Sequence, residues 1–162
     1  MKTLNPGSTI GILGGGQLGR MMSIAAAQLG YKCHIYCPDQ DNPAEQVSEK
    51  ATHASYEDFD ALEKFAQEVD VVTYEFENIP VITVEALELK TAVFPSSRVL
   101  KISQDRLSEK NFLNEIGIAT APYADVSNLN KAKKVLEKIS YPAVLKTRRF
   151  GYDGKGQAIV KS

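Results

Sequence analysis

The stretch TIGILGGGQLGRM, residues 9–21, decides the fold of this chain. Its first five residues favour a buried β-strand, and three consecutive glycines follow them. The sequence from Gln17 to Leu29 favours a helix, which Gly30 ends. A strand, a glycine turn and a helix in this order predict the opening unit of a parallel α/β sheet. We expect the apolar face of the helix to hold Leu18, Met21, Met22, Ala25 and Leu29.

The glycine turn also carries a ligand-binding pattern. Gly14, Gly16 and Gly19 have the spacing of the dinucleotide fingerprint, and Asp39 ends the next expected strand, where that fingerprint places a ribose-binding acid. Glycine amides at a helix N-terminus bind any phosphate, however, whether a pyrophosphate or a single phosphate ester. The turn therefore leaves three interpretations open: a nicotinamide dinucleotide, another phosphorylated ligand, or a tight turn with only a structural role.

The first hundred residues continue the alternation of strands and helices. Glu75 and Glu77 lie at the carboxyl end of an expected strand, where open α/β sheets bind their ligands. A carboxylate there suits a ribose hydroxyl or an amine, and a solvated strand end is the alternative. Strands are expected at residues 32–37, 70–76 and 91–95, and helices after Asn42-Pro43, Asp58 and Pro80.

The pattern changes near Pro95-Ser96-Ser97, so we expect one domain over residues 1–100 and a second over residues 101–162. The second unit is small for an independent core, and we expect it to be truncated. It is expected to contain a helix at 104–117, a strand at 123–126, and a lysine-rich helix capped by Asn128 or Asn130.

A second glycine loop, within AVLKTRRFGYDGKGQAIV at residues 143–160, joins two apolar strands. The first strand ends in Lys146, and Arg148, Arg149 and Lys155 lie among the glycines of the loop. Glycine amides and cations together favour an anionic guest, above all a nucleotide polyphosphate. The spacing differs from that of a P-loop, which opens a helix. A flexible hairpin tip with solvated charges is the alternative.

Composition narrows the classes of protein. The 162 residues include 19 basic and 20 acidic side chains, so no net field favours nucleic acid or an anionic membrane. We see no apolar run of membrane-spanning length and no secretory signal. Cys33 and Cys37 share one face of an expected strand, and neither a disulfide nor a metal site is expected. For His34 and His53 we expect structural or surface roles. These features predict a reduced, cytoplasmic protein.

The segments GGGQLGRM, CPD, EFENIP, QDRLSEKNFL and KTRRFGYDGKGQ together resemble the ATP-grasp family over nearly the whole chain. Within it, they resemble the synthetases that carboxylate 5-aminoimidazole ribonucleotide in purine biosynthesis. The resemblance implies an α/β fold with a Rossmann-like parallel sheet, the pre-ATP-grasp domain, followed by the first lobe of an ATP-grasp domain. It also implies that ATP, bicarbonate and the aminoimidazole ribonucleotide react, through carboxyphosphate, to N5-carboxyaminoimidazole ribonucleotide, ADP and phosphate.

The resemblance also implies roles for particular residues. Gly16, Gln17, Leu18 and Glu75 would hold the aminoimidazole ribonucleotide. Tyr152, Asp153 and Lys155 would meet both substrates at the reacting centre. ATP would be bound by Arg106, Lys146, Gly151, Tyr152, Asp153, Gly154, Lys155, Gly156 and Gln157.

Members of this family are longer than this chain, and their Mg2+ ligands lie beyond the part that matches. The chain is therefore expected to be an N-terminal portion that does not turn over alone, from an enzyme that is a homodimer at full length. Three alternatives remain: a formate-dependent glycinamide ribonucleotide transformylase, an NAD(P)-dependent oxidoreductase, and a non-enzymatic nucleotide-sensing fragment.

Overall fold

A computed structural model describes residues 3–136, 139, 141–151 and 154–161. The chain divides into two compact units, Met1–Lys101 and Ile102–Ser162, each of which is described by itself.

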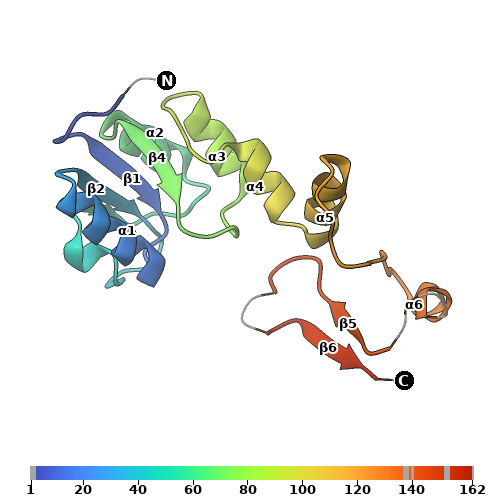
Figure 1. Cartoon of the computed structure of the whole chain (residues 1–162). Helices are drawn as coiled ribbons and strands as arrows, with labels where there is room; N and C mark the ends of the chain where they lie inside the picture. The colour runs from blue at the N-terminus through green and yellow to red at the C-terminus, as the bar shows by residue number, and fades with distance from the viewer. Residues whose placement is uncertain (1–2, 137–138, 140, 152–153, 162) are drawn as a thin grey trace. The chain divides into compact units, whose positions relative to one another are not determined.

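The first unit is built on a parallel four-stranded sheet with the strand order β3-β2-β1-β4; Figure 1 labels β2, β1 and β4. Ile10 of the central strand β1 pairs with Cys33 of β2 on one side and with Val71 of β4 on the other. The predicted parallel α/β architecture is therefore confirmed. The strands are β1 (Thr9–Leu13), β2 (Lys32–Tyr36), β3 (Lys50–Thr52) and β4 (Val71–Tyr74).

The strands of this unit differ from the expected ones in two places. The short strand β3 has little apolar character, and the sequence pattern does not predict it. Residues 91–95, predicted as a strand, make only a single bridge, between Val93 and Val72. The bonds Val72 N–H to Ala92 O (2.8 Å) and Phe94 N–H to Val72 O (2.9 Å) hold this segment beside β4 without extending the sheet.

The helices begin and end where local chemistry favours it. Asp58 caps α2 by accepting the amide of Ala61 at 3.0 Å, as predicted, and Pro80 immediately precedes α3. The helix expected after Asn42-Pro43 is only one turn of 3-10 helix, η1. The bounds are α1 (Gln17–Gln28), η1 (Glu45–Val47), α2 (Phe59–Gln67), α3 (Val81–Glu88) and α4 (Ser97–Ser103).

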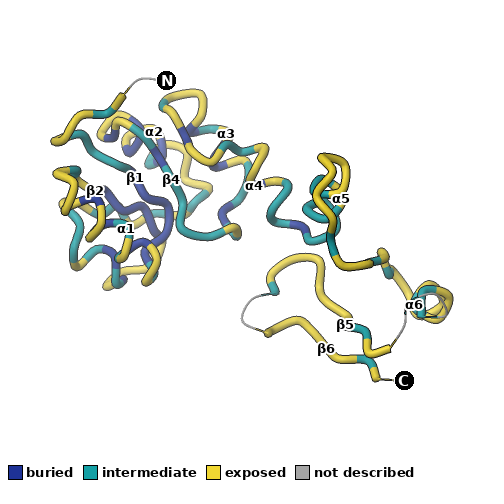
Figure 2. Tube along the Cα trace, viewed as in Figure 1, coloured by how far each residue is buried: buried dark blue, intermediate teal, exposed yellow. Residues whose placement is uncertain are grey.

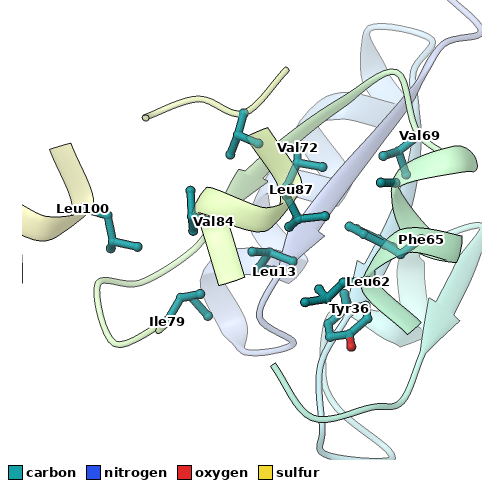
Figure 3. Close-up of a cluster of buried hydrophobic side chains, with 12 residues drawn as sticks. Leu13, Tyr36, Leu62, Phe65, Val69, Val72, Ile79, Val84, Leu87 and Leu100 are labelled. Atoms are coloured by element: carbon teal, nitrogen blue, oxygen red, sulfur yellow. The ribbon is translucent and has the colours of Figure 1, made fainter. Parts of the chain in front are cut away.

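Both faces of the sheet are covered, because alternate strand residues point to opposite sides. Leu13, Tyr36 and Val72 point toward α2 and α3, whereas Ile12 and Ile35 point toward α1. Figure 3 shows the larger cluster, in which Phe65 and Leu62 of α2, Val84 and Leu87 of α3, and Leu100 of α4 surround the strand residues. This packing fixes the carboxyl ends of β1, β2 and β4 at one edge of the sheet.

The buried face of α1 differs from the predicted one. Leu18, Met21, Ala25 and Leu29 are exposed, and of the predicted residues only Met22 packs against the core. The buried positions are instead the small residues Gly19, Ser23 and Ala26. Small side chains let the helix approach closely, since a Cβ at Gly19 would lie 3.0 Å from the carbonyl oxygen of Gly14. The sequence pattern therefore located the helix but not its contact face.

The second unit holds two helices, α5 (Arg106–Glu115) and α6 (Leu129–Leu136), and an antiparallel hairpin of β5 (Ala143–Lys146) and β6 (Gln157–Val160). The predicted hairpin is confirmed, and Asn128 accepts the amide of Lys131 at the start of α6. The helix expected at 104–117 begins two residues later, because Asp105 caps it. Residues 123–126 form no strand.

Few described residues of this second unit are buried, as the colours in Figure 2 show. No described residue of α5, α6, β5 or β6 is buried. The unit therefore lacks a core of its own within the described residues.

Candidate functional site

The first candidate site is the glycine turn between β1 and α1. Gly14 has φ +112° and its amide donates to the carbonyl of Tyr36 at 2.9 Å, which ties the turn to the end of β2. The amide of Glu75 likewise donates to the carbonyl of Leu13 at 3.1 Å, so the segment after β4 lies against the turn. The strand ends and the turn therefore meet at one edge of the sheet.

The carboxylate of Glu75 occupies the N-terminal end of α1. The amide of Gly16 donates to Glu75 Oε1 at 2.7 Å, and the amide of Gly19 donates to Glu75 Oε2. Two amides at a helix N-terminus are a natural anion site, and here a side chain of the protein fills it. A Cβ at Gly14 would lie 2.4 Å from Glu75 Cγ, so this glycine makes room for the carboxylate.

Asn42 closes the other side of the turn. A Cβ at Gly15 would lie 2.4 Å from Asn42 Cγ, and the amide of Ala44 donates to the carbonyl of Gly15 at 3.0 Å. Asn42 is itself buried: its side chain donates to the carbonyl of Asp39 and accepts the amide of Glu45, both at 3.0 Å. The glycines thus leave room for the side chains of Glu75 and Asn42, which pack where a Cβ would otherwise lie. The spacing of the glycines in the sequence does not reveal this.

A cavity of ≈ 440 Å³ opens beside the turn. Three carboxylates line it, from Asp39, Asp41 and Glu75, and its described lining contains no lysine or arginine. Tyr56 also lines it, and burial raises the pKa of this phenol well above its usual range. The described lining therefore offers acceptors and a neutral hydroxyl, which suits a guest rich in hydrogen-bond donors. The other lining residues are Gly15, Gly16, Cys37, Pro38, Gln40, Asn42, Pro43 and Phe76.

The structure brings only some of the predicted substrate residues to this cavity. Gly16 and Glu75 line it, whereas Gln17 and Leu18 begin α1 as exposed residues outside its described lining. Glu77 is exposed and also lies outside the lining, because β4 ends at Tyr74 and the chain turns away. The contribution of Asn42 and Tyr56 was not anticipated.

The second candidate site is the glycine hairpin and the start of α5. Lys146 ends β5 opposite Gln157, the first residue of β6. Gly154 and Gly156 have φ +80° and +69°, and the amide of Thr147 donates to the carbonyl of Gly156 at 2.8 Å. These contacts set the base of the loop, while Tyr152 and Asp153 lie outside the described residues.

Arg106 joins the helix to the loop. Its Nη2 donates to the carbonyl of Gly151 at 2.8 Å, and its amide donates to the carbonyl of Arg148 at 3.0 Å. The predicted ATP-binding residues Arg106, Lys146, Gly151, Gly154, Lys155, Gly156 and Gln157 therefore all belong to one hairpin and the helix end bonded to it.

Arg148 does not serve as the free phosphate-binding cation that the loop composition indicated. Its Nε and Nη2 donate to the carboxylate of Asp105 at 3.0 and 2.9 Å. Burial acts to raise the pKa of Asp105, but the hydrogen bonds from Arg148 and from the amides of Ser108 and Leu107 lower it overall. The carboxylate is thus held in its charged form beside the arginine.

Of the cysteines and histidines, only Cys37 belongs to the described lining of the cavity. His53 lies behind its wall, with Nδ1 3.2 Å from the carbonyl oxygen of Asp39 and Nε2 3.3 Å from Glu45 Oε1. Cys33 and Cys37 are buried free thiols, and burial raises the pKa of each. His34 is buried and bonds Thr52 Oγ1 through Nε2 at 2.8 Å, a structural role, as expected. Among the described residues there is no cluster of three or more potential metal ligands, and no helix there is long and apolar enough to cross a bilayer.

The chain thus combines a parallel α/β sheet, whose glycine turn holds an internal carboxylate, with a glycine hairpin bonded to the end of a helix. These features fit the class of protein that the sequence resembles, the ATP-grasp family. The chain belongs to the family of the ribonucleotide synthetase preATP-grasp domain, whose model matches residues 7–104, and an ATP-grasp domain matches residues 111–162.

The particular relatives are N5-carboxyaminoimidazole ribonucleotide synthases. The Brucella melitensis synthase is 48% identical over 160 residues, 99% of this chain and 44% of the relative. The Staphylococcus aureus synthetase complexed with ADP superposes with a TM-score of 0.94 at 39% identity, covering 100% of this chain and 43% of that one.

A third similar protein is the Aspergillus clavatus synthase in complex with ADP and 5-aminoimidazole ribonucleotide. It superposes with a TM-score of 0.79 at 26% identity, covering 97% of this chain and 41% of that one. The sequence resemblance is thereby confirmed, and the chain spans less than half the length of these relatives.

Proposed function

We propose that the protein to which this chain belongs is an ATP-dependent carbon–nitrogen ligase of purine biosynthesis. It joins bicarbonate to the exocyclic amine of 5-aminoimidazole ribonucleotide and releases ADP, phosphate and N5-carboxyaminoimidazole ribonucleotide. The names of the relatives support this reaction. Because the chain spans less than half of their length, the proposal concerns the whole protein rather than these residues alone.

The observation that carries the proposal is the carboxylate of Glu75 in the anion site at the start of α1. Both of its oxygens already accept a backbone amide, and the neighbouring cavity carries two further carboxylates. A pyrophosphate placed there would meet negative charge instead of free amides, which disfavours a dinucleotide. An amine or a ribose hydroxyl would find acceptors beside Gly16 and Glu75, so we assign these two residues to the ribonucleotide. Gln17 and Leu18, exposed at the start of α1, are assigned to it on the resemblance alone.

The glycine hairpin is assigned to ATP. Arg106 and Lys146 would neutralise the phosphates, and the loop from Gly151 to Gln157 would close over the nucleotide. We place Tyr152, Asp153 and Lys155 at the reacting centre, where bicarbonate attacks the γ-phosphorus and the carboxyphosphate formed is then attacked by the amine. Positioning and charge neutralisation supply most of the rate in such transfers. A closed loop also protects the acyl phosphate from water.

Magnesium would accompany ATP, but the described residues hold no cluster suited to it. The resemblance places its ligands beyond the part of the family that this chain matches, and we derive no step through it. We further propose a pre-ATP-grasp domain at residues 1–100, the N-terminal part of an ATP-grasp domain at 101–162, a homodimer at full length and a cytoplasmic location.

Two measurements test the function. ADP release by the protein that the whole reading frame encodes should depend on both bicarbonate and the aminoimidazole ribonucleotide. Dependence on formate and glycinamide ribonucleotide instead would identify the transformylase. In calorimetric titrations the same protein should bind ATP and not NADH, and the reverse result would favour the oxidoreductase. The 162 residues alone should release no ADP in sustained turnover.

A further inference from the structure

Asp105 is a nearly buried carboxylate, 8% exposed, at the junction of α5 and the glycine hairpin. Its Oδ1 accepts the amides of Leu107 at 3.0 Å and Ser108 at 3.1 Å, and thereby caps the helix. The same carboxylate accepts both Nε and Nη2 of Arg148. One side chain therefore ties the first turn of a helix to a segment 43 residues further along the chain.

The residues next to this ion pair are those assigned to the ATP phosphates. Arg106 follows Asp105 directly, and Lys146 lies two positions before Arg148. A second link runs parallel to the ion pair, because Arg106 donates from its backbone to Arg148 and from Nη2 to Gly151. The two assigned cations are therefore held on two segments that the Asp105–Arg148 pair fastens together.

We propose that Asp105 is a positioning residue for the binding of ATP. Through its ion pair with Arg148, Asp105 holds Arg106 and the glycine hairpin in one arrangement. The proposal rests on the assignment of the hairpin to ATP.

The chemistry of the pair suits this role better than capping alone. A helix cap needs one acceptor oxygen, which serine or asparagine also supplies. The planar fork of arginine, matched to both oxygens of a carboxylate, fixes direction as well as distance. Without the pair, binding of ATP has to supply the ordering of the two segments, which weakens the affinity for ATP. The residues assigned to bind the ribonucleotide, Gly16, Gln17, Leu18 and Glu75, belong to the first unit and keep their own contacts.

The test is steady-state kinetics of the protein encoded by the whole reading frame. Asp105→Asn keeps a capping oxygen and removes the charge. Arg148→Gln removes the arginine that bonds both carboxylate oxygens and keeps Arg149, whose Nε lies 3.9 Å from Asp105 Oδ2. Each should raise KM for ATP on the order of tenfold, as loss of an orienting partner does elsewhere. KM for the aminoimidazole ribonucleotide should change less than twofold. The double variant should be no worse than Asp105→Asn alone, because that substitution already removes the ion pair with Arg148.

Asp58→Asn is the matched control. Asp58 caps α2 in the first unit by accepting one backbone amide, that of Ala61, so the substitution shows the effect of changing an aspartate cap that has no arginine among the described residues hydrogen-bonded to it. It should leave KM for ATP unchanged. The change in its Tm shows how much stability is lost when asparagine replaces aspartate at a helix cap.

Three results would overturn the proposal. Arg148→Gln could raise KM for ATP while Asp105→Asn does not, which would mean that Arg148 contacts ATP itself. Both variants could leave KM for ATP within twofold. Alternatively, Asp105→Asn could lower Tm and raise both KM values together, which indicates a structural role only.

A titration with ATP by calorimetry separates this proposal from the function. If carboxylation is absent but ATP binds, weaker binding by Asp105→Asn still supports the positioning role. If the unmodified protein binds no ATP, both proposals are wrong.

Discussion

Glu75→Gln tests most sharply whether the glycine turn is built around an internal carboxylate. The substitution keeps the size of the side chain and one acceptor oxygen, but replaces the other oxygen with a donor. The amides of Gly16 and Gly19 now both donate to this carboxylate. In the variant, one of these amides would face an NH2 group and lose its partner.

The magnitude follows from the two hydrogen bonds. A hydrogen bond to a charged group contributes about 1.5–3 kcal/mol and a neutral one about 1 kcal/mol. The variant loses one charged bond entirely and turns the other into a neutral one. We therefore expect the free energy of opening at the start of α1 to fall by about 2–5 kcal/mol.

The assay is amide hydrogen exchange by NMR on the 162-residue chain. Exchange at Gly16 and Gly19 should accelerate at least about tenfold, since each 1.36 kcal/mol corresponds to a factor of ten. Glu85→Gln, an exposed position on α3, is the matched control and should leave both rates unchanged. Equal exchange rates in Glu75→Gln and in the control would refute the internal carboxylate and, with it, the argument against a dinucleotide.

Three further predictions concern stability and ATP. Burial lowers the pKa of His34 to about 4 from an ordinary 6.5, opposed by Glu68 and reinforced by Lys50, so the folded state resists a proton that the unfolded chain accepts. The free energy of unfolding is therefore unaffected by His34 well above pH 6.5 and falls as the pH drops toward 4, by about 2 kcal/mol at pH 5. Urea unfolding at pH 7.5 and at pH 5 should show this loss, and His34→Gln should remove the part that His34 causes. Gly11→Ala should destabilise the first unit by about 1–3 kcal/mol, because the new Cβ would lie 2.6 Å from Phe65 Cζ; thermal unfolding measures this, and a Tm equal to that of the unmodified chain contradicts the packing. Lys146→Ala should raise KM for ATP by about tenfold or more if this cation binds a phosphate, whereas Lys131→Ala on α6 should not; equal KM values in the two variants would remove Lys146 from the site.

The sequence specified the order of elements well, because that order rests on local signals. An apolar run, a glycine turn and an amphipathic segment locate β1 and α1 to within a residue. Asp58 and Asn128 mark helix starts through their capping oxygens. By contrast, β3 is three residues of which two are polar, and only its neighbour β2 makes it a strand.

The contact face of α1 could not be predicted from hydrophobicity. Periodicity favours the large apolar residues, but the distance between helix and sheet is set by the close approach of Gly19 to Gly14 and Glu75. At such a distance only small side chains fit, so Ser23 and Ala26 are buried and Leu18 is not. A tertiary constraint outweighed the local pattern.

In both candidate sites the sequence predicted the local motif but not the partner that lies far away in the sequence. The glycine spacing indicated an anion site, but not that Glu75, more than fifty residues away in sequence, supplies the anion. Similarly, the cations of the second loop indicated a polyphosphate, yet Arg148 is paired with Asp105. Each of these outcomes depends on a charged partner distant in the sequence, and a motif contains no information about such a partner.

The most direct test of the central claim follows the carbon atom of bicarbonate. The protein encoded by the whole reading frame is incubated with ATP, the aminoimidazole ribonucleotide and isotopically labelled bicarbonate, and the nucleotide product is analysed by mass spectrometry and NMR. We expect one labelled carboxyl group bonded to the exocyclic nitrogen, with one ADP formed for each product molecule. ADP formation with no label in the ribonucleotide would contradict it.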